Sequence, residues 1–135
     1  MADLFSFELV CPEKLLLSAD ASMVVIPGAE GDFGVLVGHT PLISALRPGV
    51  IDVYVGDTVN GRIFVAGGFA EVTGARCTVL AEEAVPVEEI NQMTAQARSS
   101  AALEAIDNVT NAAARTQAET ELAVAEAMVS AARTN

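Results

Sequence analysis

The sequence lacks tryptophan and is poor in histidine, cysteine and basic residues. One histidine and two distant cysteines, Cys11 and Cys77, cannot supply the four ligands of a tetrahedral zinc site, so no metal site is expected. Only 7 Lys and Arg stand against 18 Asp and Glu, which gives a formal net charge of −11. A surface this acidic repels phosphate groups, which argues against nucleic acid and anionic lipid as direct ligands.

Long apolar runs are also missing. The longest uninterrupted ones, such as residues 15–17 and 23–26, are far shorter than the ~20 residues that cross a bilayer, so no direct insertion into lipid is expected. The beginning, Met1-Ala2-Asp3, has no basic segment followed by an apolar one, so no signal peptide is expected. Both cysteines are interpreted as buried thiols in a reducing cytosol, with a disulfide or a reactive thiol as the alternative.

The composition of the chain changes at about residues 84–87. Hydrophobic residues make up 52% of the sequence, which is enough for a packed core. Before the boundary the chain is rich in Val, Ile, Phe and Gly, whereas after Pro86 it contains no Gly, Pro or aromatic residue. We therefore expect two domains, residues 1–86 and residues 87–135.

The first domain repeats one pattern, a short β-rich run followed by a turn. In residues 5–11 apolar side chains alternate with Ser6, Glu8 and Val10, which indicates a strand with one buried face. Further runs end at turn signals such as Pro27-Gly28. These runs occupy residues 23–26, 33–37, 42–46, 50–55, 62–66, 69–73 and 76–81. Short strands at this spacing, with no helical pattern between them, predict an antiparallel β-sandwich or barrel.

The second domain is predicted to form two helices. Alanine, the strongest helix former, dominates it, and Glu88 and Glu89 suit a helix N-terminus. In the first helix, one contact face is predicted from residues at helical spacing, Ile90, Met93, Ala97 and Ala101. Leu103 and Ile106 lie on roughly the opposite face, which leaves a second contact surface open. In the second, a seam of mostly small side chains recurs every three or four residues: Ala114, Ala118, Leu122, Ala125, Val129 and Ala132.

A turn is predicted at residues 107–110 between these helices. Thr110 is the expected cap of the second helix, and a capping box at Thr116 is the alternative start. The expected fold class is therefore α+β, an N-terminal antiparallel β-sandwich followed by a C-terminal antiparallel α-helical hairpin.

Candidate chemistry is sparse in this sequence. His39 is interpreted as a structural or solvated residue near a turn, with contact to a partner as the alternative. The glycine-rich residues 28–34 lack the Lys-Ser/Thr of a P-loop and carry two acids, so they are interpreted as a turn. We expect no catalytic and no cofactor-binding residue. Two classes of protein remain, a non-catalytic interaction subunit and a small-molecule-binding sandwich with a regulatory tail.

Several glycine- and proline-containing motifs occur in order along residues 1–86. They are CPEKLL (11–16), VVIPG (24–28), EGDFGVL (30–36), GHTPL (38–42), ALRPG (45–49), VAGGFAEV (65–72) and TVLAE (78–82). In these motifs and their spacing the chain resembles the epsilon subunit of F-type ATP synthases. The helical half is similar to that family in length and layout, and only weakly in residues.

The resemblance implies a non-catalytic subunit in the central stalk of the rotary enzyme. There the sandwich binds the gamma subunit and sits on the c-ring, which helps to couple proton flow to ATP synthesis. The acidic turn that faces the c-ring corresponds to Gly31, Asp32 and Phe33, and His39 lies in the neighbouring motif near the rotor contacts. The alpha and beta subunits are implied as further partners of the hairpin.

The resemblance also bears on regulation and location. Relatives whose hairpin binds ATP carry two arginines at the positions of Thr94 and Ala101, so no ATP or other cofactor is expected here. Relatives that inhibit ATP hydrolysis use basic hairpin residues, but residues 82–135 hold nine acids and three bases, so only weak inhibition is expected. The start at Met1 suggests a bacterial chain at the cytoplasmic face of the inner membrane, with the mitochondrial counterpart, called delta, as the alternative.

Overall fold

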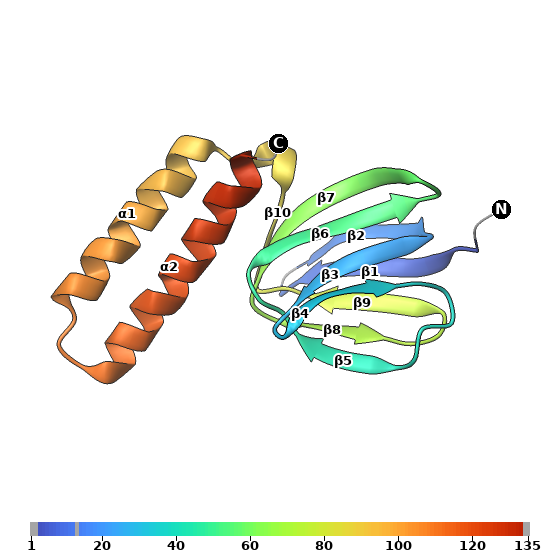
Figure 1. Cartoon of the computed structure of the whole chain (residues 1–135), viewed down its shortest axis with the longest axis horizontal. Helices are drawn as coiled ribbons and strands as arrows, with labels where there is room; N and C mark the ends of the chain where they lie inside the picture. Colours follow the sequence, from blue (N-terminus) through green and yellow to red (C-terminus); the bar gives the residue numbers. More distant parts are fainter. Residues whose placement is uncertain (1–2, 13, 134–135) are drawn as a thin grey trace. The chain divides into compact units, whose positions relative to one another are not determined.

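The computed structural model describes residues 3–12 and 14–133. Contacts between Cα atoms divide the chain into two compact units, one ending at Pro86 and the other beginning at Val87. The first unit is built from strands and the second from helices, which confirms the predicted α+β fold class (Figure 1). Met1 and Glu13, which belong to the predicted start and the opening motif, lie outside the described residues.

The described part of the first unit forms a sandwich of two five-stranded sheets. In order across the first sheet, the strands are β2 (Lys14–Ala21), β1 (Phe5–Cys11), β9 (Arg76–Leu80), β8 (Phe69–Val72) and β5 (Leu42–Ala45). In order across the second, they are β10 (Glu83–Pro86), β7 (Thr58–Ala66), β6 (Gly49–Val55), β3 (Met23–Gly28) and β4 (Gly31–Val35). Neighbouring strands are antiparallel, apart from β1 and β9, which are parallel.

The core of the sandwich lies between the two sheets, and alternation along the strands builds it. In β1, Phe5, Phe7 and Leu9 are buried while the residues between them are half-buried. The second sheet contributes Ile26 and Ile51, both fully buried in the same cluster. Because the inner face of each sheet is apolar, stacking the two inner faces removes both from water.

Two strands, β2 and β10, were absent from the sequence prediction. In β2 the register shifts opposite Leu9 and Val10, which pair with Leu17 and Leu15 and leave Leu16 as an extra residue. This bulge interrupts the period of two on which the prediction depended. Strand β10 has only four residues and ends at Pro86, so it offers too little alternation to be recognised.

The second unit begins with a short 3₁₀ turn, Val87–Glu89, and continues with α1 (Gln92–Asn108) and α2 (Ala112–Arg133). Figure 1 shows the two helices side by side and joined by a short connection, as an antiparallel hairpin. Asn91 caps α1 by accepting a hydrogen bond from the Thr94 N–H at 3.0 Å. The predicted caps of α2, Thr110 and Thr116, are wrong, because the Asn111 side chain accepts from the Ala114 N–H at 2.8 Å instead.

The predicted contact face of α1 that includes Met93 is also wrong. Met93 is 82% exposed, whereas the buried residues of this helix are Ala95 and Ala102. Small side chains allow two helices to approach closely, so alanines occupy the interface and the larger Met93 is excluded from it. The predicted seam of α2 is confirmed, since its members are buried or half-buried. An ion pair between Arg98 and Glu121 also joins the two helices.

Candidate partner interface

The acidic turn is the tip of the β3–β4 hairpin. Gly31 has φ +138, in the region that favours glycine. A Cβ on Gly28 would lie 2.8 Å from the Gly31 carbonyl oxygen and 2.9 Å from the Phe33 ring. The ring therefore packs against a backbone position that only glycine can occupy, and this contact fixes how the turn is folded.

Asp32 projects from this turn and forms an ion pair with Arg47. Arg47 also donates from Nη1 to the Gly28 carbonyl oxygen at 2.6 Å. The side chains of Asp32 and Arg47 remain 61% and 42% exposed, so the pair lies at the surface. Two motifs of the sequence, residues 30–36 and 45–49, thus meet at one place.

Sequence reasoning missed Arg47 as a member of this site. The sequence does show that Arg47 lies in another turn motif and carries a charge opposite to that of Asp32. However, the two residues are 15 positions apart, so the sequence did not indicate that they are in contact. The bridge between Gly28 and Leu46, together with the hydrogen bond from the Arg47 N–H to the Pro27 carbonyl oxygen, brings them together at this end of the sandwich.

His39 lies in the connection between β4 and β5, at the other end of β4 from the acidic turn (Figure 1). The ring is half-buried, and its Nδ1 lies 2.6 Å from the Thr40 carbonyl oxygen. Because a carbonyl oxygen only accepts, Nδ1 must carry a proton to form this hydrogen bond. The four predicted contact residues therefore fall into two places, with Gly31, Asp32 and Phe33 together and His39 apart.

Apolar side chains form a continuous row across the outer face of the first sheet. The strand registers pair Leu15 with Val10, Val10 with Leu80, Leu80 with Phe69, and Phe69 with Ala45. We call these five residues the outer row. Leu15, Leu80 and Phe69 are 54%, 40% and 42% exposed. A contiguous apolar strip on a monomer surface is typical of a site that binds another protein.

A groove of about 360 Å³ lies along the outer row. Its lining residues come from three strands and the segments that follow or precede them: Val10, Cys11, Pro12, Gly68, Phe69, Leu80, Ala81 and Glu82. The Leu46 N–H donates to the Gly68 carbonyl oxygen at 3.1 Å, and the Ala29 N–H donates to the Ala45 carbonyl oxygen at 2.8 Å. These bonds place the groove and the acidic turn at the same end of the sandwich.

The charges of the sandwich surface are mostly acidic, because its described arginines pair with acids. Arg62 lies 3.0 Å from Asp52, and Arg76 lies 3.7 Å from Glu8. The three arginines, including Arg47, are thus paired with acids, and the excess negative charge of the surface comes from the other carboxylates. The surface therefore favours a partner that supplies apolar side chains and positive or N–H-donating groups.

The two cysteines are free thiols. Cys77 is fully buried, and burial raises the pKa of its thiol from 9.0 to about 12. Cys11 is half-buried and lines the groove. The predicted burial of the thiols is therefore complete for Cys77 and partial for Cys11.

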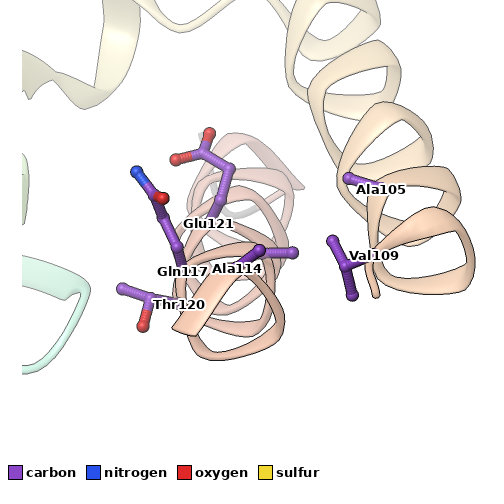
Figure 2. Close-up of a pocket in the computed structure, with 7 residues that line it drawn as sticks. Ala105, Val109, Ala114, Gln117, Thr120 and Glu121 are labelled. Carbon is purple, nitrogen blue, oxygen red and sulfur yellow. The ribbon is translucent and has the colours of Figure 1, made fainter. Parts of the chain in front are cut away.

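The helical unit carries a second hollow, of about 540 Å³, near the connection between its helices. Figure 2 shows Ala105 from α1, Val109 just after the end of α1, and Ala114, Gln117, Thr120 and Glu121 from α2 around it. The charged member of this lining is Glu121, which is paired with Arg98, so the lining offers a phosphate no positive charge of its own. Within residues 3–12 and 14–133, neither a cluster of metal ligands nor a helix long and apolar enough to span a bilayer is found.

A small sandwich with an exposed apolar row, a paired acidic turn and a helical appendage has the features of a protein-binding subunit. Residues 4–87 match the family described as ATP synthase, Delta/Epsilon chain, beta-sandwich domain. The chain is 53% identical to the ATP synthase epsilon chain of Paramagnetospirillum magneticum, over 97% of this chain and 98% of that one. It is 49% identical to the epsilon chain of Rhodospirillum rubrum, over the same shares of both chains.

Solved structures agree with these sequence matches. A chain in the Euglena gracilis mitochondrial ATP synthase, described as OSCP/F1/c-ring, is 26% identical with a TM-score of 0.81, over 95% of this chain and 81% of that one. A chain in the central stalk/c-ring of the Tetrahymena thermophila enzyme shares the fold, with a TM-score of 0.73 at 16% identity, over 95% and 96% of the two chains. The chain therefore belongs to the ATP synthase epsilon chain family, which confirms the resemblance in its motifs.

Proposed function

We propose that this chain is a non-catalytic central-stalk subunit of an F-type ATP synthase, which joins the gamma subunit to the c-ring. In that position it couples proton translocation to ATP synthesis, while catalysis takes place on other subunits. Its proposed location is the cytoplasmic face of a bacterial inner membrane, held there by protein contacts. The bacterial origin of the epsilon chains at about half identity supports this location.

The observation that carries the proposal is the outer row with its groove. Leu80 and Phe69 are large apolar side chains that remain about two-fifths exposed in the isolated chain. Fully burying such a side chain contributes about 1.5–3 kcal/mol, so covering the exposed two-fifths contributes roughly 0.6–1.2 kcal/mol for each residue, and a partner that covers the row gains several such contributions. We assign this face to the gamma subunit, since a rotor joint must resist torque and needs an extended contact.

The acidic turn is proposed to contact the c-ring. Gly31, Asp32 and Phe33 lie at the tip of the β3–β4 hairpin, where they can reach a polar loop without disturbing the sandwich. His39, at the other end of β4, is proposed to contact the rotor separately, within an exposed apolar segment that includes Leu36 and Ile43. The two ends of the sandwich thus offer different chemistry to the rotor.

The hairpin is proposed to inhibit ATP hydrolysis only weakly, through transient contacts with the alpha and beta subunits. Arg98 is paired with Glu121 between the helices, and Arg115 pairs with Glu119 at 3.1 Å. These arginines would have to leave their acids before they could bind an acidic target. Each exchange of one exposed ion pair for another yields at most about 1 kcal/mol, so a strong inhibitory contact is disfavoured.

The gamma assignment is tested with Leu80→Ser in the outer row and Val59→Ser as the matched control. Leu80 and Val59 are 40% and 41% exposed, but Val59 lies in β7 of the other sheet. Titration with purified gamma subunit should show at least about tenfold weaker binding for Leu80→Ser, about 1.4 kcal/mol. Val59→Ser should bind like the unchanged chain. Equal affinity of both variants and the unchanged chain would remove the outer row from the gamma interface.

The c-ring assignment is tested with Asp32→Arg, which reverses a charge at the turn and places it beside Arg47. Proton pumping driven by ATP should fall in membrane vesicles, while the thermal unfolding of the isolated chain changes little, because a surface charge of this kind acts mainly on association. Unchanged pumping and unchanged assembly of the complex would show that Asp32 is not at the c-ring joint.

A further inference from the structure

Arg47 makes more contacts with the acidic turn than a simple surface ion pair requires. Its backbone N–H donates to the Pro27 carbonyl oxygen at 3.0 Å, and Nη1 donates to the Gly28 carbonyl oxygen at 2.6 Å. Nη2 of the same guanidinium binds the Asp32 carboxylate. One residue, which follows β5 of the first sheet, thus holds both sides of a hairpin in the second sheet.

The backbone beneath this guanidinium is closely packed. A Cβ on Gly49 would lie 2.9 Å from the Pro27 Cβ, just as a Cβ on Gly28 would meet the Phe33 ring. Neither glycine therefore has room for a side chain. The planar fork of Arg47 can reach a carbonyl oxygen and a carboxylate at once, which a lysine ammonium on its flexible stem cannot match in geometry.

The charges of the turn are distributed unevenly as a result. Asp32 shares its charge with Arg47, whereas the Glu30 side chain is exposed and has neither hydrogen bond nor ion pair within the described part of the chain. With two acids and one base, the turn keeps a net charge of −2 + 1 = −1, and that charge resides at Glu30. Glu30 is therefore the acid that is free to bind a partner, whereas Asp32 is held by Arg47.

We propose that Arg47 is a positioning residue that sets the shape of the turn through Asp32 and Gly28, and that Glu30 presents the charge which binds the partner. The partner group is a cationic or N–H-donating group of a c-ring loop. This assignment rests on the proposed function for the identity of the partner, but the role of Arg47 can be measured without one.

The first measurement follows amide hydrogen exchange in the isolated full-length chain. Arg47→Met should accelerate exchange of the Ala29 N–H, which bonds to Ala45 across the two sheets, by about tenfold. Arg62→Met, which removes the base of the Asp52 pair on the same sheet, is the matched control and should leave this amide within about twofold. Arg47→Lys should give an intermediate rate, because it restores the charge without the fork. An unchanged rate in Arg47→Met would overturn the positioning role.

The second measurement compares affinities of the full-length chain for a purified rotor of gamma subunit and c-ring at low ionic strength. Glu30→Gln should weaken binding about fivefold, equivalent to about 1 kcal/mol, and Asp32→Asn less than about twofold, because asparagine still accepts a hydrogen bond from Arg47. A larger loss with Asp32→Asn would identify Asp32 as the contact and overturn the assignment to Glu30. Failure of the unchanged chain to bind any rotor would contradict the proposed function instead, while the exchange rates would still decide the role of Arg47.

Discussion

The sandwich and the hairpin of this chain are stabilised in different ways. The sandwich buries large side chains, among them Phe7 and Ile51, which are fully removed from water. The hairpin buries mostly alanine, such as Ala95, Ala102 and Ala125, and adds an ion pair between its helices. Since the free energy of burial scales with apolar area, each residue of the sandwich core contributes far more than a residue of the alanine seam.

Because of this difference, we expect the two units to tolerate substitutions unequally. The sandwich depends on close fits, as at Gly28 and Gly68, so its surface features are held in defined positions. The hairpin depends on helix propensity and on a smooth seam, so its packing is more easily altered. A unit with a core of large side chains suits a permanent joint, and a unit that buries mostly alanine suits an accessory element.

The largest effect is expected from Gly68→Ala in the sandwich. Gly68 has φ +91, and a Cβ there would lie 1.8 Å from the Leu80 carbonyl oxygen, a backbone atom that cannot move aside. The free energy of unfolding should fall by at least about 4 kcal/mol in urea denaturation. Gly74→Ala is the matched control, since nothing lies within 4 Å of its Cβ, and it should change stability by less than about 1 kcal/mol. A well-folded Gly68→Ala chain would show that the connection from β7 to β8 is not tightly packed against Leu80.

The next effect compares a core residue from each unit. Phe7 and Ala125 are both fully buried. Phe7→Ala should cost about 3–5 kcal/mol, because it removes a large side chain and leaves a cavity. Ala125→Gly should cost about 1 kcal/mol, mainly through helix propensity. Fluorescence of the single tyrosine, Tyr54, follows the sandwich, and circular dichroism at the helix band follows the hairpin. Equal losses in the free energy of unfolding would show that the two units are not stabilised in different ways.

Stability should also depend on pH through Cys77. Its pKa is 9.0 in the unfolded chain and about 12 when buried, so only the unfolded state releases this proton between those values. The stabilisation is therefore present below pH 9 and declines by at most about 1.4 kcal/mol per pH unit above it. Comparing unfolding of the unchanged chain and Cys77→Ala from pH 8 to 11 isolates this contribution. Identical slopes for both proteins would mean that the thiol ionises while the sandwich remains folded.

The smallest effect is expected from removing the hairpin. A chain ending at Val87 should fold, as judged by circular dichroism, and should still bind gamma, because the outer row and the acidic turn lie within the sandwich. ATP hydrolysis by a complex with this shortened chain should stay within about twofold of that with the full chain. A rise of about tenfold or more, about 1.4 kcal/mol of lost inhibition, would contradict the proposed weak inhibition.

Most strands and both helices could be predicted because their patterns are local. The alternation around Phe7 and the alanine seam of α2 each depend on neighbours within one element. The prediction was wrong where a pattern was interrupted or lacked contrast. The bulge at Leu16 concealed β2, and alanines on several sides of α1 left its buried face undetermined, so the larger Met93 was placed there incorrectly.

The sequence by itself determined the α+β class, the family and the acidic surface. Composition, periodicity and the order of turn motifs can all be recognised in the sequence without knowing which distant residues are in contact. Only the tertiary structure decided which distant residues meet. Strand periodicity indicates which face is buried, but it does not indicate which strand lies beside which. The parallel pairing of β1 with β9 and the outer row drawn from five strands depend on the order of strands in the first sheet, and the contact of Arg47 with Asp32 depends on how the two sheets meet.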